Sequence, residues 1–311
     1  MLIGILAGVA TGALWGLSFV APRAVEPFST WDFTVVRYGI FGLASLLLLA
    51  HPRFRPVGMG WRRVGIGLLL GAGGYIGFFI SVAYAVRLAG AVIPPLIVGL
   101  LPVVLAMIAN GRQRSLPWRE LALPLAFILA GMLLVNVAAS AAGAERRADL
   151  LLGILFSLAA LGSWVFYGLL NAEVMRAPAP PDAMRWTCLQ GLGTLFGCLV
   201  VLPMTTFLQP GGADWAAFAT PGGVRFLVWA VMMGLAGTWL ATWFWTQASR
   251  RLPLAFSAQL IVTETVFGLV YGLVYEQRLP TLTETMGVVL QLAGVAMAIA
   301  LFTRRARLAE G

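Results

Sequence analysis

Apolar runs of about 20 residues follow one another along nearly the whole chain, and short segments that hold most of the charges separate them. A run of this length can cross the hydrocarbon core of a bilayer as a helix. Backbone groups in lipid must be paired within the segment, which requires helices and not open strands. The pattern therefore predicts an all-α polytopic membrane protein. Its ten predicted spans are residues 2–21, 32–50, 64–86, 91–109, 121–139, 150–173, 184–204, 224–247, 254–274 and 283–302.

The arginines predict the orientation of these spans. All 21 basic residues are Arg, and they give the chain a net charge of +9. Such a charge would suit a nucleic-acid partner, but most of these arginines lie in short loops between apolar runs, as in membrane topology. An even number of spans puts both termini on one side. If that side is the cytoplasm, its loops hold 14 arginines and the outer loops hold six, with Arg37 inside a span. We therefore expect a multi-pass inner membrane protein with both termini cytoplasmic.

Composition supports this class and argues against catalysis. The chain is 60% hydrophobic and 11% charged, with mean hydropathy +0.90, and no polar stretch is long enough for a separate soluble domain. The apolar run beginning at Leu2 has no basic leader, so we expect it to be a span and not a removed signal. Cys188 and Cys198 share one apolar run and are expected to be buried free thiols. His51 is alone, so we expect no metal site, no cofactor and no enzyme activity.

The two halves of the sequence resemble each other. Leu2–Leu6 matches Leu151–Leu155 at an offset of 149, which places Trp15 on Trp164; farther along the offset is 163, which places Arg87 on Arg250. Each copy holds five spans, so the second copy enters the membrane from the opposite side. The predicted organisation is a repeat at 1–140, a short linker at 141–149 and a second repeat with a cytoplasmic tail at 150–311. Inverted repeats place a substrate site near the bilayer midplane.

Small residues and prolines mark special places in these spans. Gly4, Gly8, Gly12 and Gly16 form one smooth stripe along the first span, and the third span is also rich in glycine. Such stripes let another helix approach closely, and packing or sliding during transport would both use them. The fourth span contains three prolines, which loosen a helix. They are either a structural kink or a gate: Pro94, Pro95 and Pro102.

At this point the chain resembles the drug/metabolite transporter superfamily of the EamA type. The matching features are the short turn repeated at Arg87–Gly90 and Arg250–Pro253, Pro102, and an Ala-Gly pair in each closing span. The resemblance covers nearly the whole chain, and the aromatic-rich spans look like amino-acid exporters of the YddG type. It implies two five-helix repeats and export of small metabolites by alternating access. The second repeat departs from the pattern, because Thr265 stands where such repeats often have proline.

Two charged residues fall deep within predicted spans. Glu264 lies near the middle of the ninth span, where a carboxylate costs roughly 2.5–3.5 kcal/mol on insertion scales. It is either a hydrogen-bonded structural acid or a substrate or proton site, since burial favours the neutral form. Arg37 can extend its stem to the interface, or hold a carboxylate with its planar guanidinium.

Aromatic and polar side chains gather on single faces of several spans by the i, i+4, i+7 rule. Aromatic residues often anchor a span at the membrane interface, but Trp15 and Trp164 lie deep and share their faces with polar groups. We expect these faces to line a central cavity. The predicted substrate-binding residues are Thr11, Trp15, Ser18, Arg37, Tyr75, Phe78, Trp164, Tyr167, Thr242, Trp245, Glu264 and Tyr271.

An aromatic lining with one acid and one base suits a small solute with an apolar body and a charged head. Aromatic or other apolar amino acids fit this description, with the ammonium near Glu264 or on an indole face. The expected partners are thus a small-molecule substrate, the lipid bilayer and, as an open possibility, protons; one chain suffices for the twofold arrangement. An exporter of lipophilic cationic drugs and an uncoupled channel are the alternatives. No Walker-type loop is present, so ATP-driven pumping by this chain is not expected.

Overall fold

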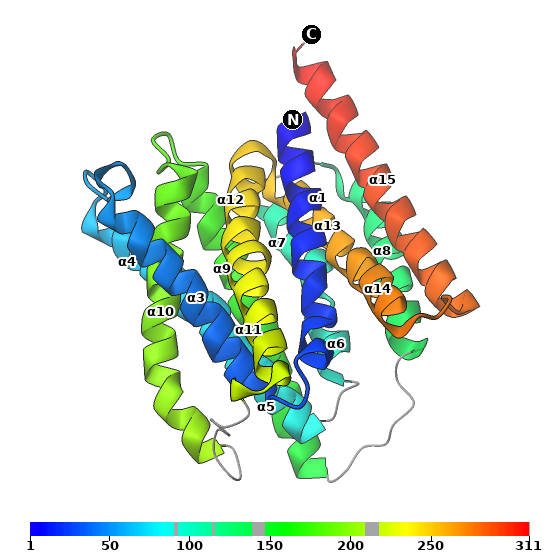
Figure 1. The fold of residues 1–311 in the computed structure, drawn as a ribbon. Helices are drawn as coiled ribbons and strands as arrows, with labels where there is room; N and C mark the ends of the chain where they lie inside the picture. The colour runs from blue at the N-terminus through cyan, green and yellow to red at the C-terminus, as the bar shows by residue number, and fades with distance from the viewer. Residues whose placement is uncertain (90–92, 114–115, 139–146, 209–217, 311) are drawn as a thin grey trace.

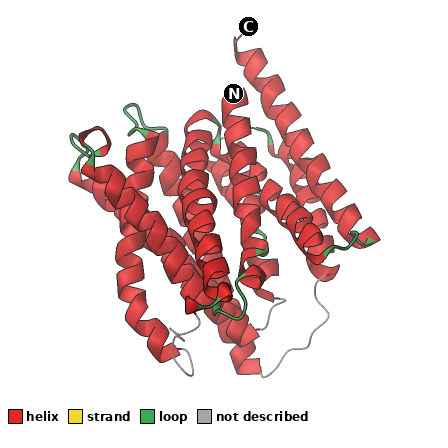
Figure 2. Cartoon of the chain, in the orientation of Figure 1, coloured by secondary structure: helices red, strands yellow, loops and turns green. Residues whose placement is uncertain are grey.

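The computed structural model describes residues 1–311 apart from 90–92, 114–115, 139–146, 209–217 and 311, and the described residues form helices joined by turns (Figures 1 and 2). Both termini lie at the same end of the bundle (Figure 1). The first half contains α1 (Leu2–Gly16), η1 (Leu17–Phe19), α2 (Ala21–Ala24), α3 (Thr30–Ala50), η2 (Pro52–Phe54), α4 (Trp61–Gly71), η3 (Ala72–Gly77), α5 (Phe78–Ala89), α6 (Ile93–Val98), α7 (Leu101–Gln113) and α8 (Trp118–Ala138). The second half contains α9 (Arg147–Met175), α10 (Ala183–Leu208), α11 (Pro221–Gly234), η5 (Leu235–Leu240), α12 (Ala241–Arg251), α13 (Leu254–Leu260), α14 (Val262–Glu276) and α15 (Leu282–Glu310).

Eight helical stretches of the described residues are long and apolar enough to cross a membrane. They coincide with eight of the ten predicted spans. The predicted span at 91–109 corresponds to the short helices α6 and α7, and the span at 121–139 corresponds to α8. Residues 141–146 of the predicted linker lie outside the described residues. The prediction of an all-α polytopic membrane protein is therefore confirmed at this level.

Two of the long spans contain a π-helical segment, which the sequence did not predict. These segments are η3 and η5, at Ala72–Gly77 and Leu235–Leu240. They are separated by the same 163 residues that relate the later parts of the two halves. Within η5, the Thr238 hydroxyl donates to the Met233 carbonyl oxygen at 2.8 Å, five residues earlier. Because a π turn changes which residues share a face, i, i+4, i+7 groupings across these segments are displaced.

The helices that follow the π-containing spans are both interrupted. The first interruption lies between α6 and α7, and Pro94 and Pro102 each sit in the first turn of a helix. Proline is tolerated there because the first-turn N–H has no helical partner. The second interruption, at Ile261, needs no proline. The Thr263 hydroxyl donates to the Leu260 carbonyl oxygen at 2.6 Å, and the Glu264 N–H bonds to Ile261 only three residues back. These local bonds compete with the regular helical ones.

The glycine stripe of α1 packs against the second half of the protein. A Cβ at Gly8 would meet the Leu260 side chain, and a Cβ at Gly16 would lie 2.8 Å from the Gly268 backbone nitrogen. Gly4 faces Leu252 in the same way. The predicted close helix approach is thus present, and it places α1 directly beside α13 and α14.

Glycine also allows contact between α4 and α10. A Cβ at Gly71 would overlap the Gln190 carbonyl oxygen and lie 2.8 Å from the Thr194 nitrogen, whereas a Cβ at Gly73 would meet nothing within 4 Å. We therefore expect Gly71→Ala to lower the melting temperature of the purified protein, because overpacking costs about 1–3 kcal/mol. Gly73→Ala should leave it unchanged or raise it slightly. Thermal unfolding of the two variants in one detergent measures the difference, and equal melting temperatures would contradict the assigned contact.

The two closing helices, α8 and α15, lie side by side (Figure 1). Gly131 faces the backbone of Gly287, and a Cβ at Gly294 would lie 2.7 Å from the Pro124 carbonyl oxygen. The glycine of each Ala-Gly pair therefore lies where the two helix backbones approach each other.

Candidate functional site

The centre of the bundle holds a cluster of aromatic side chains around Trp164. Its ring centroid lies 5.0 Å from that of Trp15, 5.0 Å from Tyr167, 5.6 Å from Phe78 and 6.2 Å from Tyr75. Most of these pairs are edge-to-face, the arrangement favoured by the ring quadrupole. The cluster continues from Trp15 to Trp245, at 5.9 Å. Aromatic side chains from both halves of the sequence thus meet at one place.

Corresponding helices of the two halves bring these residues together. Trp15 on α1 and Trp164 on α9 are the pair related by the offset of 149. α1 packs on α12 and α14, while α9 packs on α5, α6 and α7. Each first helix therefore lies against the third and fourth spans of the opposite half, and its tryptophan points between the halves.

Hydroxyl groups connect the aromatic cluster across the interface of the halves. The Tyr75 hydroxyl lies 2.5 Å from the Thr242 hydroxyl and 3.3 Å from that of Tyr167. The Tyr167 hydroxyl donates to Gln190 Oε1 at 2.7 Å. All four side chains are buried, so each hydroxyl depends on a protein partner or a ligand.

A buried polar network that the sequence reading missed continues from this point. Gln190 Nε2 donates to Asn171 Oδ1 at 3.2 Å, and Trp186 Nε1 donates to the same oxygen at 2.8 Å. Asn171 Nδ2 donates in turn to the Ser249 hydroxyl at 3.2 Å. A glutamine within the apolar run of α10 was the available signal, because polar groups inside a membrane helix require partners.

Arg37 is held at the edge of the aromatic cluster. Its Nη2 donates to the Tyr38 hydroxyl at 3.2 Å, and its guanidinium carbon lies 4.5 Å from the centroid of that ring. The Tyr38 ring lies 5.7 Å from the ring of Tyr75. Arg37 therefore lies beside the aromatic cluster, with its guanidinium held on Tyr38.

Glu264 lies in the first turn of α14, and its backbone packs against Gly12 and Gly16 of α1, on either side of Trp15. The ion pairs among the described residues involve neither Glu264 nor Arg37. Both side chains are partly exposed. The centre of the protein thus contains one acid and one base that form no ion pair with each other among the described contacts.

Several hydrogen-bond donors of the site have no partner among the described residues. They are the indole N–H groups of Trp164 and Trp245 and the Nε–H of Arg37, all of which are buried. A buried donor without an acceptor costs about 1–3 kcal/mol. An acceptor group of a bound ligand, such as a carboxylate, would satisfy one or more of them.

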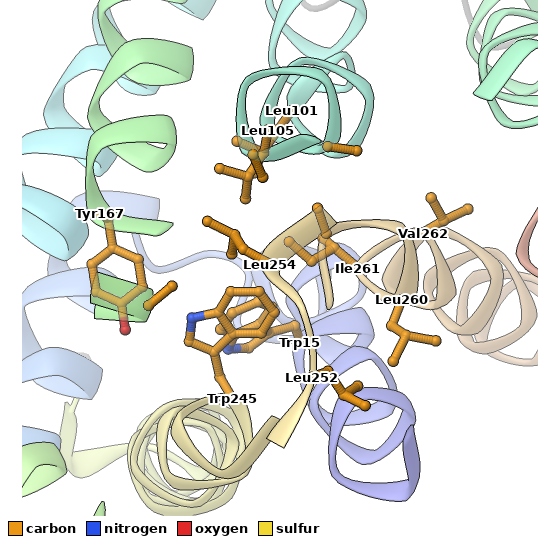
Figure 3. Close-up of a cluster of buried hydrophobic side chains, with 14 of the residues drawn as sticks. Trp15, Leu101, Leu105, Tyr167, Trp245, Leu252, Leu254, Leu260, Ile261 and Val262 are labelled. Atoms are coloured by element: carbon orange, nitrogen blue, oxygen red, sulfur yellow. The ribbon is translucent and has the colours of Figure 1, made fainter. Parts of the chain in front are cut away.

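An apolar layer closes the site towards the end that holds the termini. Leu254 lies between Leu105 of α7 and the indole of Trp245, and Leu252 and Leu260 continue the layer towards α1 (Figure 3). All seven residues of α13 are buried. By contrast, residues 78–84 of α5 are all partly exposed. We call this layer the inner closure.

The predicted site residues divide into three groups. Trp15, Tyr75, Phe78, Trp164, Tyr167, Thr242 and Trp245 meet in the aromatic cluster, with Arg37 and Glu264 beside it. Thr11 is buried one turn away, and its hydroxyl donates to the Ala7 and Ala241 carbonyl oxygens at 2.8 and 3.4 Å. Ser18 and Tyr271 are partly exposed, and among the described contacts neither forms a ring contact or a hydrogen bond with a residue of the cluster. The ring centroid of Tyr271 lies 5.9 Å from that of Phe267.

Two of the expected gate residues, Pro94 and Pro102, are buried at helix starts. The side chain of Pro95 lies outside the described residues. Cys188 and Cys198 are buried free thiols, as predicted.

The fold and the site define a multi-pass α-helical membrane protein with an enclosed aromatic centre. Comparison with known proteins places the chain further. It is 30% identical over 306 residues to inner membrane protein YtfF of Escherichia coli (strain K12), a match that covers 96% of this chain and 95% of that protein. The chain belongs to the family of that protein, and with its apolar helices this relationship assigns it to the inner membrane.

Two further comparisons concern families and folds. No family model matches the chain. A solved structure described as "Crystal structure of protein" superposes with a TM-score of 0.74, over 97% of this chain and 98% of that one, at 16% identity. At that identity the likeness concerns the fold alone.

Proposed function

We propose that the protein is a secondary transporter that exports small amphipathic metabolites, above all aromatic or other apolar amino acids. The observation that carries this proposal is the buried aromatic cluster around Trp164, with Arg37 beside it. Among the described residues, the indole N–H groups of Trp164 and Trp245 have no acceptor, and neither Arg37 nor Glu264 belongs to an ion pair. An apolar side chain fits the aromatic walls, a carboxylate fits the donors, and an ammonium group fits Glu264 or an indole face.

The proposed architecture is that of an EamA-type drug/metabolite transporter, with ten spans in two inverted repeats. Three features support it: the π-helical segments 163 residues apart, the interruptions in the fourth and ninth spans, and the packing of each first helix on the opposite half. A repeat of five spans crosses the membrane an odd number of times, so its second copy is inverted. The arginine distribution favours cytoplasmic termini, and the transport cycle is alternating access around the central site.

Uptake of radiolabelled phenylalanine into proteoliposomes tests this function, with and without an imposed pH gradient. Saturable uptake that tryptophan and tyrosine compete for is the expected result. A response to the gradient beyond that of voltage would indicate proton coupling. Flux that neither saturates nor shows counterflow would indicate the uncoupled channel, and absence of uptake above empty liposomes would overturn the proposal.

Trp164→Ala tests the location of the binding site. The ring of Trp164 contacts four other aromatic side chains of the site, and such contacts are worth about 0.5–1.5 kcal/mol each. We expect the half-saturating phenylalanine concentration to rise about 3- to 10-fold. Trp61→Ala is the matched control, because Trp61 is 87% exposed at the start of α4. An unchanged half-saturating concentration in Trp164→Ala would place the substrate elsewhere.

A further inference from the structure

A pocket lies on the other side of the inner closure from the aromatic cluster. It has a volume of about 180 Å³ and is formed between α7, α9 and α13. Its walls are apolar at Ala109, Leu169 and Leu254, and its charged groups are Arg112, Glu173 and Arg176. At about 30 Å³ per water, this volume equals about six waters. We call this cavity the inner pocket.

The inner pocket leads directly to the inner closure. Leu105, Ala109 and Arg112 follow one another at i, i+4 and i+7 and so share one face of α7. Leu254 belongs to the pocket wall and also lies between Leu105 and Trp245 in the inner closure (Figure 3). A solute that moved along α7 from Arg112 towards Leu105 would therefore reach the layer that covers the aromatic site.

The three charged residues of the inner pocket are exposed at the ends of α7 and α9. Arg112 lies in the last turn of α7 and Arg176 just beyond α9, where cations are favoured by the helix dipole. Glu173 lies in the last turn of α9, where the same dipole disfavours an acid. None of the three belongs to an ion pair among the described residues. On α9, Leu169, Glu173 and Arg176 share one face, so the exposed acid and base lie next to the apolar wall of the pocket.

We propose that the inner pocket is the first binding site for the exported solute, a small zwitterion with an apolar side chain. Arg112 and Arg176 take its carboxylate, Glu173 takes its ammonium group, and Leu169 and Leu254 contact its apolar part. When the inner closure opens, the solute passes from this pocket to the aromatic site, where a second acid and base receive the same two groups. This inference rests on the proposed function and adds a second, cytoplasmic site to it.

Side-specific counterflow tests the inner pocket. Protein reconstituted in one known orientation is assayed for phenylalanine exchange, with the substrate concentration varied first at the cytoplasmic face and then at the outer face. For Glu173→Gln and for the double variant Arg112→Gln/Arg176→Gln, we expect the half-saturating concentration to rise about tenfold at the cytoplasmic face and less than twofold at the outer face. Arg119→Gln and Glu120→Gln are matched controls, because both residues are exposed and charged like those of the pocket but lie at the start of α8, outside the pocket lining.

Inhibitors with one charge separate the two roles within the pocket. Phenethylamine lacks the carboxylate, so its inhibition from the cytoplasmic face should weaken only in Glu173→Gln. Phenylpropionate lacks the ammonium group, so its inhibition should weaken only in the arginine double variant. A phospholipid headgroup with an ammonium and a phosphate has the same chemistry. If the effects of the variants vanish in liposomes without ethanolamine lipids, the pocket holds lipid and the proposal is overturned.

The outcomes distinguish this inference from the proposed function. If wild-type protein exchanges phenylalanine and all variants match it at both faces, the inner pocket is not a binding site, while the central site stands. If wild-type protein does not carry phenylalanine, the proposed function is wrong, and the inner pocket as its first site is wrong with it.

Discussion

Glu264→Gln is expected to lower phenylalanine transport at least tenfold at subsaturating concentrations. Glu264 is a partly exposed acid at the start of α14, and its backbone packs on α1 at Gly12 and Gly16, next to Trp15. A hydrogen bond to a charged group contributes about 1.5–3 kcal/mol, which corresponds to about a 10- to 150-fold change in affinity. Glutamine keeps the size of the side chain and removes its negative charge, so an ammonium group would lose this partner. Initial rates in proteoliposomes measure the effect.

Two further variants show whether a loss of transport in Glu264→Gln reflects loss of substrate binding, and whether the substrate is an amino acid or a lipophilic cation. Glu120→Gln removes an exposed acid at the start of α8 and should transport normally. Arg37→Gln should impair amino-acid transport, because it removes a donor for the carboxylate. A lipophilic cation would need Glu264 but not Arg37, so loss of transport only in Glu264→Gln would favour the drug-export alternative. Wild-type rates in Glu264→Gln would exclude this residue from the substrate site.

Gly12→Leu is expected to prevent recovery of folded protein. A Cβ at Gly12 would overlap the Thr263 hydroxyl and lie 2.9 Å from the Glu264 backbone nitrogen. Even modest overpacking costs about 1–3 kcal/mol, and the rest of a leucine side chain has no space between α1 and α14. The variant would push α14, and with it Glu264, away from α1. Size-exclusion chromatography in mild detergent should show loss of the monodisperse species.

Gly39→Leu is the matched control for this prediction. A Cβ at Gly39, on α3, would meet nothing within 4 Å, so the variant should yield folded protein. The smaller variant Gly12→Ala should remain folded with a lowered melting temperature. If Gly12→Leu elutes like the wild type, α1 and α14 do not pack as closely as described.

The two helix interruptions have different chemical origins. In the first half, prolines begin the helices on both sides of the interruption. In the second half, the hydroxyl of Thr263 donates a hydrogen bond to the Leu260 carbonyl oxygen, and Glu264 is the next residue in the sequence. The absence of proline at Thr265 therefore does not make the second half continuous. The interrupted backbone is buried, and its carbonyl groups at Leu260 and Ile261 are bonded to Thr263 and Glu264.

Sequence alone determined the class of the protein and the location of its helices. The length and hydrophobicity of an apolar run can be read locally from the sequence. In lipid, the backbone groups of such a run can be paired within the run only as a helix. The close packing of α1 could also be predicted from the sequence, because four glycines on one helix face favour close approach of another helix. Trp15, Trp164, Arg37 and Glu264 stood out because polar and aromatic groups deep within a span are costly or specific.

The tertiary structure decided which of these faces meet and what lies between them. A π turn shifts the face of every later residue in its span, so Thr238 points to its own backbone while Thr242 joins Tyr75. The network through Gln190 and Asn171 joins helices far apart in the sequence, and no local pattern encodes that pairing. The inner pocket is likewise formed by side chains from three helices. Contacts of this kind arise from packing geometry, which depends on the whole bundle at once.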